Sequence, residues 1–438
     1  MGWDTCLVSG TRTDAGPHAD ARNFYAGLPL HPVDFTPALA SPAPLRCDPG
    51  PGAAPMHASF EERAGAPDQP AATLDDATAD LQARAWAREL GRAGAASANV
   101  LHLHHLTPLN EAATRAAPGV PVVGHLHGTE LLMLEAIDSG PPPAWPCGHP
   151  WAARMRRWAR ACARLTAASE RGALRASRLL GIDRQQVVVV PNGFDEELFQ
   201  PRSCDPLAHW HEHLVRKPHG WRPHRGVGSI RYGESDLSAF AGAPVLLYIG
   251  RFTSVKRVPL LIRAYARAQP RLVYRAPLVL LGGYPDEWEG QHPLEVIEAL
   301  GTRDVFLAGW HDHNALPDFL GASDVLVLPS VAEQFGQAIV EAMACAVPPI
   351  AVGRFGPADI IEPGATGWLV PPDDEQALAD AIVEAVNRPK ERDRRGRLAH
   401  AAAHERWSWS VSSRALAGVL ESASATSARF GPNLVGTE

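Results

Sequence analysis

Short runs of apolar and β-branched residues alternate along the chain with longer stretches rich in Ala and Arg. The apolar runs are typical of strands in a parallel sheet, and the stretches between them predict the helices that connect these strands. We expect strands at residues 5–9, 100–106, 120–126, 164–168 and 186–190 in the first half, and at 245–250, 278–282, 305–308, 324–328 and 349–352 in the second half. The pattern therefore predicts the α/β fold class.

The length of 438 residues exceeds one ordinary core and predicts two domains. We place an N-terminal domain at residues 1–195 and a C-terminal domain at 243–404, joined by a linker or insertion at 196–242 that mixes Pro, Gly, Trp and His without periodicity. A helix at 405–421 is expected to pack back on the N-terminal domain, and 422–438 to form a flexible tail. Two Rossmann-like domains that face each other across a cleft are the architecture that follows.

The strand expected at residues 5–9 opens the chain with no strand before it. A doubly wound domain usually begins with a strand, a loop and a helix. We therefore expect the first βα unit of the N-terminal domain to be missing, which would make this domain a truncated one.

Composition narrows the class of protein and its surroundings. The net charge of −7 lacks the basic excess of a nucleic-acid-binding protein. No apolar stretch approaches the ~18 residues of a membrane-spanning helix, and the first residues lack the pattern of a secretion signal. The cysteines are scattered without a Cys-x-x-Cys pair, which is typical of reduced thiols. We therefore expect a cytoplasmic protein that binds no nucleic acid.

Basic residues follow the first strand of the second half at its carboxyl end, where open α/β sheets bind ligands. The run that ends in Gly250 continues with Arg251 and, one loop later, Lys256. Arg supplies a planar fork of donors and Lys a point charge, and together they suit a diphosphate. Only three of the 41 basic residues are lysines, which makes Lys256 the more unusual cation, whereas a surface salt bridge remains the alternative for Arg251.

Glycine follows two further strands of the second half. Gly282 and Gly283 end one strand, and Gly309 with Trp310 ends the next. Because glycine has no Cβ, its backbone can approach a ligand closely, although many Gly-Gly pairs are simple turns. Together with the cations, these strand ends suit a nucleoside diphosphate that carries a polyhydroxylated group.

Two glutamates, Glu333 and Glu341, flank the start of a predicted helix directly after the strand at 324–328. The helix is expected to begin at about Phe335 or Gly336, so that Glu341 lies about one and a half turns into it. The free N–H groups at the helix start form an anion site between the two acids. A solvated loop acid and a helix acid paired with an Arg remain the alternative interpretation.

Histidines gather at strand ends of the first half. His127 follows the strand at 120–126 in a His-Gly turn, and His104 or His105 ends the neighbouring strand. Histidine pairs on neighbouring strands are more often rim or core residues than metal ligands, and no third ligand has clear spacing, so we expect no metal site. The histidines of the insertion are expected to be solvated: His209, His211, His213, His219 and His224.

The stretch at residues 151–164 predicts a helix with five arginines beside Trp158. Contact with an anionic membrane surface or a phosphorylated acceptor is one interpretation of this helix. We favour a solvated face paired with local acids, so that any association with a membrane is peripheral at most.

One set of motifs in the second half occurs together: Gly250-Arg251 with Lys256, Glu333-x7-Glu341 with Phe335-Gly336, Glu341-Ala-Met-Ala344, and Thr366-Gly367-x-Leu-Val-x-Pro. With these motifs the second half resembles the donor domain of the retaining family 4 glycosyltransferases, also called glycosyl transferases group 1, which have the GT-B fold. The resemblance covers roughly residues 95–420 and is densest at roughly 244–372.

The resemblance implies a role for each donor-site residue. Arg251 and Lys256 would bind the donor diphosphate. Glu333 would contact the hydroxyls of the transferred sugar, and Glu341 would accept hydrogen bonds from the nucleotide ribose. The segment at 307–310 would lie along the nucleotide base. The implied donor-binding set is Gly250, Arg251, Lys256, Gly282, Gly309, Trp310, Glu333, Phe335, Gly336 and Glu341.

The implied activity is transfer of a sugar from a UDP- or GDP-linked donor to a hydroxyl of an unidentified small molecule, glycan or lipid. The anomeric configuration would be retained, and the lack of any Asp-x-Asp motif fits phosphate handling without a metal or other cofactor. The residues expected to take part in catalysis are His127, Glu333, Arg251 and Lys256. The alternative is a catalytically degenerate protein that binds nucleotide-sugars.

Overall fold

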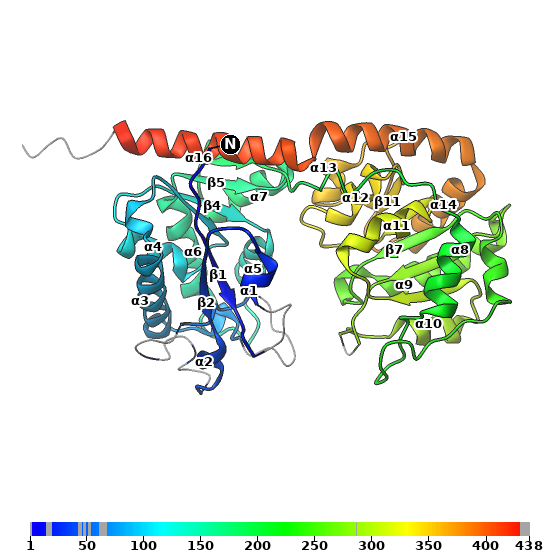
Figure 1. Cartoon of the computed structure of the whole chain (residues 1–438), viewed down its shortest axis with the longest axis horizontal. Helices are drawn as coiled ribbons and strands as arrows, with labels where there is room; N and C mark the ends of the chain where they lie inside the picture. The colour runs from blue at the N-terminus through cyan, green and yellow to red at the C-terminus, as the bar shows by residue number, and fades with distance from the viewer. Residues whose placement is uncertain are drawn as a thin grey trace, which may run out of the picture. The chain divides into compact units, whose positions relative to one another are not determined.

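The computed structural model describes residues 2–14, 20–42, 46, 50, 54–60, 68–285 and 287–429. Contacts between residues divide the chain into two compact units (Figure 1): unit 1 comprises residues 1–190 and 414–438, and unit 2 comprises residues 191–413. Each unit has its own parallel β-sheet with helices between the strands. The predicted α/β class is therefore confirmed.

A four-stranded parallel sheet forms the centre of unit 1. Its strands, in spatial order, are β3 (Leu101–His104), β4 (Val122–Leu126), β5 (Arg164–Ala167) and β6 (Val187–Val189). All four were expected from their apolar runs. Because the strands are parallel, their carboxyl ends lie at one edge of the sheet.

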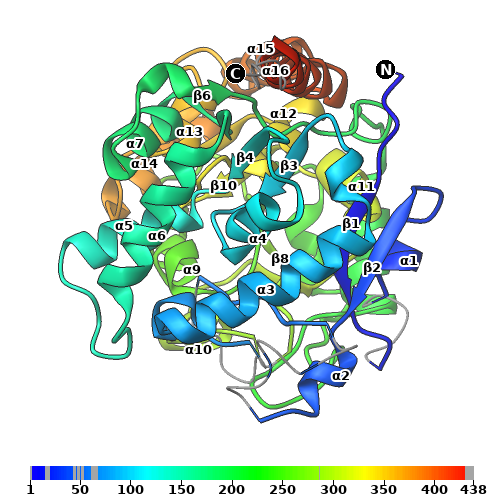
Figure 2. The same cartoon turned by 90° about the vertical axis from the view of Figure 1, so that its left-hand side faces the viewer.

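The longer helices of unit 1 are α3 (Asp76–Arg92), α4 (Pro108–Ala116), α5 (Thr129–Asp138), α6 (Gly148–Ala161) and α7 (Glu170–Leu180). Trp151 and Met155 of α6 are buried in one apolar cluster with Leu165 of β5. Helices α3 and α4 lie side by side, and Figure 2 shows them together in front of the sheet. Both helices begin with a side-chain cap, which satisfies a free backbone N–H at the helix start.

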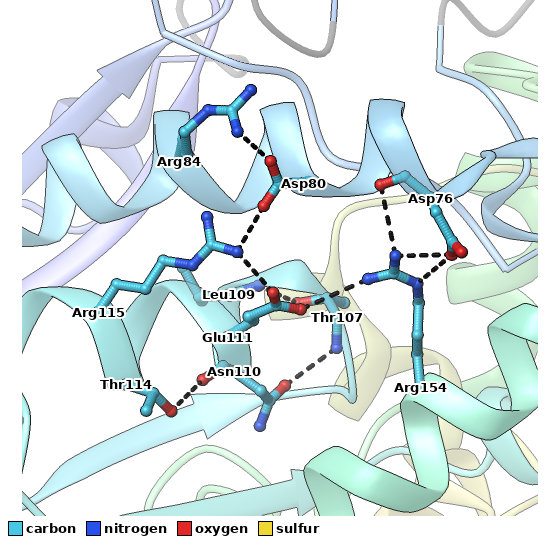
Figure 3. A network of polar contacts seen from close by, with 10 residues as sticks. All are labelled: Asp76, Asp80, Arg84, Thr107, Leu109, Asn110, Glu111, Thr114, Arg115 and Arg154. Atoms are coloured by element: carbon cyan, nitrogen blue, oxygen red, sulfur yellow. Dashed lines mark hydrogen bonds and ion pairs between the residues drawn. The ribbon is translucent and has the colours of Figure 1, made fainter.

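A network of charged side chains joins α3, α4 and α6 (Figure 3). Arg154 of α6 donates to Asp76 of α3 at 2.7 Å and to Glu111 of α4 at 3.4 Å. Arg115 of α4 donates to Asp80 at 2.5 Å and to Glu111 at 2.6 Å. These contacts confirm that Arg154 is paired with local acids, whereas its side chain is only 11% exposed, so the predicted solvation is wrong at this position.

A second, two-stranded parallel sheet lies near the start of the chain. β1 (Leu7–Thr11) pairs with β2 (Leu30–Asp34), and the short helices α1 (Ala21–Phe24) and α2 (Thr36–Leu39) follow the two strands. The first strand expected in the chain thus lies slightly later than predicted and pairs in a sheet of its own. β2 was not predicted, because Pro32 interrupts its short apolar pattern; proline is tolerated mainly at sheet edges.

A six-stranded parallel sheet forms the centre of unit 2, in the order β12-β11-β10-β7-β8-β9. Its strands are β7 (Leu246–Ile249), β8 (Leu278–Leu281), β9 (Val305–Gly309), β10 (Val325–Leu328), β11 (Pro349–Val352) and β12 (Trp368–Val370). All but β12 were expected from their apolar runs. β12 was missed because its three residues are too few to show a period, and it forms by pairing with β11.

The helices of unit 2 are α8 (Pro206–His211), α9 (Val258–Ala268), α10 (Pro293–Leu300), α11 (Leu316–Gly321), α12 (Gln337–Ala344), α13 (Gly356–Ile360), α14 (Glu375–Asn387) and α15 (Pro389–Arg406). Helix α16 (Trp409–Arg429) begins in unit 2 and continues into unit 1, where Val419 is buried with Val123 and Val190. Its last turns occupy residues that were predicted to be a flexible tail. Across the described parts of the chain, none of the helices combines the length and apolar character needed to cross a membrane.

The segment at 196–242, expected to be an irregular linker or insertion, contributes buried aromatic residues to unit 2. Trp210 of α8 is fully buried, and its Nε1 donates to the carbonyl of Ala322 at 3.1 Å. Trp221 is also buried, and its Nε1 donates to the carbonyl of Gly283 at 3.0 Å. The segment is therefore an integral part of the fold of unit 2.

The histidines of this segment were predicted to be solvated, and for two of them the prediction was wrong. The rings of His209 and His213 lie 4.7 and 4.6 Å from the ring of Phe319. Burial lowers the pKa of His209 to about 4. His224, in contrast, is exposed.

We expect Trp210→Ala to lower the free energy of unfolding of unit 2 by about 3–5 kcal/mol, because it removes a buried indole and leaves a cavity. Urea unfolding followed by far-ultraviolet circular dichroism measures this change. Leu207→Ala on the same helix is the matched control, since Leu207 is 41% exposed, and it should change the unfolding free energy little. Equal effects of the two substitutions would contradict a structural role for the segment.

Candidate functional site

The loop after β7 carries the first of the predicted phosphate-binding cations. Tyr248 of β7 is buried, and its hydroxyl donates to the carbonyl of Arg251 at 2.7 Å, which fixes the backbone of this loop. Burial raises the pKa of the Tyr248 hydroxyl well above its ordinary value, so the hydroxyl remains a donor. The Arg251 side chain is exposed and forms no hydrogen bond or ion pair with any residue that the structure describes. Its guanidinium is therefore available to an anion.

Lys256 and Glu333 form an ion pair between two loops. Lys256 ends the turn at Ser254–Lys256, Glu333 follows β10, and Nζ of the lysine donates to Oε1 of the glutamate. The side chains are 20% and 14% exposed, so water screens their attraction only in part. The backbone N–H of Val331 donates to the carbonyl of Val255 at 3.0 Å and holds the same two loops together. Two residues predicted from separate motifs are thus direct neighbours.

Helix α12 begins at the predicted place. Gly336 occupies the N-cap with a φ of 105°, a conformation that residues with a side chain rarely adopt. The buried Phe335 lies against the backbone of Gly356, where an added Cβ would meet the Phe335 carbonyl oxygen at 2.1 Å. Within the described residues, no hydrogen bond takes the backbone N–H groups of Gln337 and Ala338. These free donors make the helix start suitable for an anion.

Glu341 lies in the second turn of α12 and is only 3% exposed. Its Oε1 accepts hydrogen bonds from Nε2 of His313 at 2.9 Å and from Nε2 of Gln337 at 3.1 Å. The hydrogen bond to Glu341 raises the pKa of His313. The alternative prediction of an Arg partner is therefore wrong for Glu341, which is held by a histidine and an amide.

The ends of β8 and β9 form the edge where the nucleotide base was predicted to lie. The N–H of Gly282 donates to the carbonyl of Gly309 at 2.7 Å. Gly309 has a φ of 72°, and an added Cβ would meet the carbonyl oxygen of His219 at 2.1 Å. Trp310 and Tyr284 are 48% and 53% exposed, and their ring centroids lie 6.0 Å apart. This edge therefore presents an exposed pair of aromatic rings.

His127, the predicted active-site histidine, lies in unit 1 at the end of β4. Its Nε2 lies 2.8 Å from Nδ1 of His104 on the neighbouring strand. His105 is bonded through Nδ1 to Glu130 at 2.6 Å, and Glu130 is fully buried. The loss of surrounding water, and then the charge of His105, lower the pKa of His127 to about 4. The imidazole of His127 is therefore neutral at physiological pH.

His125 lies within β4, two residues before His127. It is 8% exposed, its Nδ1 has no hydrogen-bond partner, and burial lowers its pKa to about 2. His102 of β3 has an unbonded buried Nε2 beside it, with the ring centroids 5.5 Å apart. In the parts of the chain that the structure describes, no group of His, Cys, Asp and Glu side chains is arranged to hold a metal ion.

The residues of unit 2 offer two kinds of binding group. Arg251, Lys256 and the start of α12 suit an anion, whereas the buried Glu341 suits hydroxyl donors. Sequence reasoning missed His313, which lies in the loop after the predicted strand at 305–308 but belongs to no motif. Its proximity to Glu341 depends on the packing of the loop after β9 against helix α12.

Two family models match the chain. The model described as glycosyl transferases group 1 matches residues 235–401, which contain Arg251, Lys256, Glu333 and Glu341. The model described as Glycosyltransferase Family 4 matches residues 47–198, which contain His127.

Curated relatives match over part of their length. A D-inositol 3-phosphate glycosyltransferase of Kineococcus radiotolerans is 30% identical, over 63% of this chain and 60% of its own length. An alpha-D-kanosaminyltransferase of Streptomyces kanamyceticus is 31% identical, over 43% of this chain and 47% of its own length. The chain thus spans about half to three fifths of the length of these two relatives.

Solved structures share the fold. Sucrose-phosphate synthase of Thermosynechococcus elongatus superposes with a TM-score of 0.66, covering 96% of this chain and 99% of its own, at 19% identity. HepE of Anabaena, solved in complex with UDP and glucose, superposes with a TM-score of 0.60, covering 77% and 81% of the two chains, at 20% identity. These structures have the GT-B fold, and the two family models cover both of its halves here. The chain belongs to family 4 of the glycosyltransferases, the glycosyl transferases group 1.

Proposed function

We propose that the protein transfers a sugar from a nucleotide-sugar to a hydroxyl acceptor, with retention of the anomeric configuration and without a metal ion. The observation that carries this proposal is the ion pair of Lys256 with Glu333 beside the free N–H groups at the start of α12. Lys256, which can bind a phosphate, and Glu333, which can bind sugar hydroxyls, are thus in direct contact. The exposed Arg251 adds a second cation from the loop after β7.

A UDP-linked sugar is the donor that we propose. HepE, which shares the fold, has been solved with UDP and with UDP-glucose. In this chain the exposed rings of Trp310 and Tyr284 offer a face on which a base can stack. The names of two relatives, a D-inositol 3-phosphate glycosyltransferase and an N-acetyl-alpha-D-glucosaminyl L-malate synthase of Bacillus anthracis, support a small polar acceptor with a hydroxyl group.

In the proposed reaction the bond between the anomeric carbon and the diphosphate oxygen breaks first. Positive charge develops on the sugar ring and negative charge on the leaving diphosphate. Arg251, Lys256 and the N–H groups of Gln337 and Ala338 would stabilise the negative charge. The acceptor hydroxyl then attacks the same face of the sugar and gives its proton to the leaving phosphate, which produces retention without a covalent enzyme intermediate.

We also propose a reducing compartment such as the cytoplasm, because the cysteines that the structure describes are free thiols. Cys162 and Cys345 are free thiols, buried at 5% exposure each. Burial raises the pKa of both thiols to about 12, so they remain protonated and unreactive.

We expect Lys256→Ala to lower kcat about 10²–10³-fold, because the leaving diphosphate loses one charged donor. A donor-hydrolysis or transfer assay with detection of released UDP measures this loss. Lys390→Ala is the matched control, since Lys390 is exposed on α15, and it should leave kcat unchanged. A Lys256→Ala enzyme with wild-type turnover would show that the cation does not assist the reaction. Tight binding of UDP-sugars by the wild type without any turnover would instead indicate a protein that only binds them.

The pKa of His127 gives a second test. Because this pKa is about 4, the neutral imidazole is present at pH 5 and above, and its contribution should fall only as the pH falls through about 4. We expect kcat/KM for the donor, which reports the free enzyme, to show no acid limb near the ordinary histidine pKa of about 6.5, and His127→Ala to lower kcat/KM. A limb near pH 6.5 that disappears in His127→Ala would contradict the neutral state.

A further inference from the structure

We propose that His313 is a positioning residue, which orients the carboxylate of Glu341 toward the ribose of the donor nucleotide. The inference rests on the proposed function and extends it to a residue outside the motifs of the chain. His313 begins the single turn at His313–Ala315 after β9, whereas Glu341 comes from α12. Their contact therefore links the loop after β9 to helix α12.

Both protein donors reach the same oxygen of Glu341. Nε2 of His313 lies 2.9 Å from Oε1, and Nε2 of Gln337 lies 3.1 Å from the same atom. No residue within the described ranges forms a hydrogen bond with Oε2. The carboxylate is thus fixed through one oxygen, and the other keeps its lone pairs for the two hydroxyls of a ribose.

The hydrogen bond between His313 and Glu341 matters because the carboxylate of Glu341 is buried. Glu341 is 3% exposed, and a buried carboxylate is costly unless it is hydrogen-bonded. The His313 side chain is 55% exposed, so the imidazole forms the boundary between the buried acid and solvent. The hydrogen bond to Glu341, with a smaller contribution from the charge of Asp195, raises the pKa of His313. A protonated imidazole makes a stronger, charge-assisted hydrogen bond to the carboxylate.

A third segment supports both donors. The ring of Phe199 lies 5.2 Å from the ring of His313, and Nε2 of Gln337 also donates to the carbonyl of Gly193 at 3.0 Å. The segment at 193–199 therefore contacts both His313 and Gln337, the two residues that donate to Glu341. The Phe199 ring therefore supports the imidazole of His313 on one side.

The loop that carries His313 also carries Trp310. The base and the ribose of one nucleotide would consequently meet the same short loop, Trp310 directly and His313 through Glu341. Loss of His313 should therefore act on recognition of the ribose, whereas stacking of the base and binding of the diphosphate should persist.

Calorimetric titration of the full chain with UDP and with 2′,3′-dideoxy-UDP isolates the contribution of the ribose hydroxyls. We expect the wild type to bind UDP at least about tenfold more tightly than the dideoxy nucleotide, as one hydrogen bond to a charged group provides. His313→Ala should weaken UDP binding about tenfold and leave binding of the dideoxy nucleotide within about twofold. His313→Gln keeps an N–H donor and should restore most of the preference for UDP.

His211→Ala is the matched control, because it breaks another His–Glu pair of unit 2, in which Nε2 of His211 lies 2.7 Å from Oε1 of Glu234. This variant should keep the wild-type preference. If His313→Ala weakens both nucleotides equally, or neither, the positioning role is overturned while the proposed function stands. If the wild type binds neither nucleotide, the proposed donor itself is wrong, which is a different result from loss of the preference alone.

Discussion

The common direction of the six strands of unit 2 is the constraint on which its candidate site depends. Because these strands are parallel, the loops that follow them emerge at one edge, although they are far apart in the sequence. Each loop can then supply a different group: Arg251 and Lys256 follow β7, Trp310 and His313 follow β9, and Glu333 follows β10. A mixed or antiparallel sheet of the same strands would distribute these side chains over two opposite edges.

The ion pair of Lys256 with Glu333 shows how two charged side chains at this edge can be stable before a ligand binds. A half-buried charge without a partner is costly, and each of these side chains removes that cost for the other. In the proposed function, a diphosphate would take Lys256, and the hydroxyls of the sugar would take Glu333. Binding would then exchange one set of partners for another, so that no new unpaired charge is buried and the site remains stable in both states.

Local patterns made much of the fold and part of the site predictable. The apolar runs gave the four strands of the unit 1 sheet and all but β12 of the unit 2 sheet, because a buried strand needs several consecutive apolar residues. The start of the helix at Gly336 was predicted from the apolar strand and the turn that precede it and from the apolar periodicity that follows it. His313 and the buried Trp210 could not be found in this way. Their positions depend on contacts with residues distant in the sequence, Glu341 and Ala322, which no local pattern contains.

The segment at 196–242, which carries Trp210, also contacts the candidate site. An added Cβ at Gly220 would meet the carbonyl oxygen of Leu307 at 2.3 Å, and one at Gly309 would meet that of His219 at 2.1 Å. The backbone at residues 219–220 is therefore in close contact with the backbone at the end of β9. Nδ1 of His219 also lies 3.1 Å from the carbonyl oxygen of Trp310. His219 and Gly220 lie outside the residues 235–401 that the family model matches, whereas Arg251 and Lys256 lie within them. The segment at 196–242 therefore shapes the end of the candidate site at which we propose that the base binds.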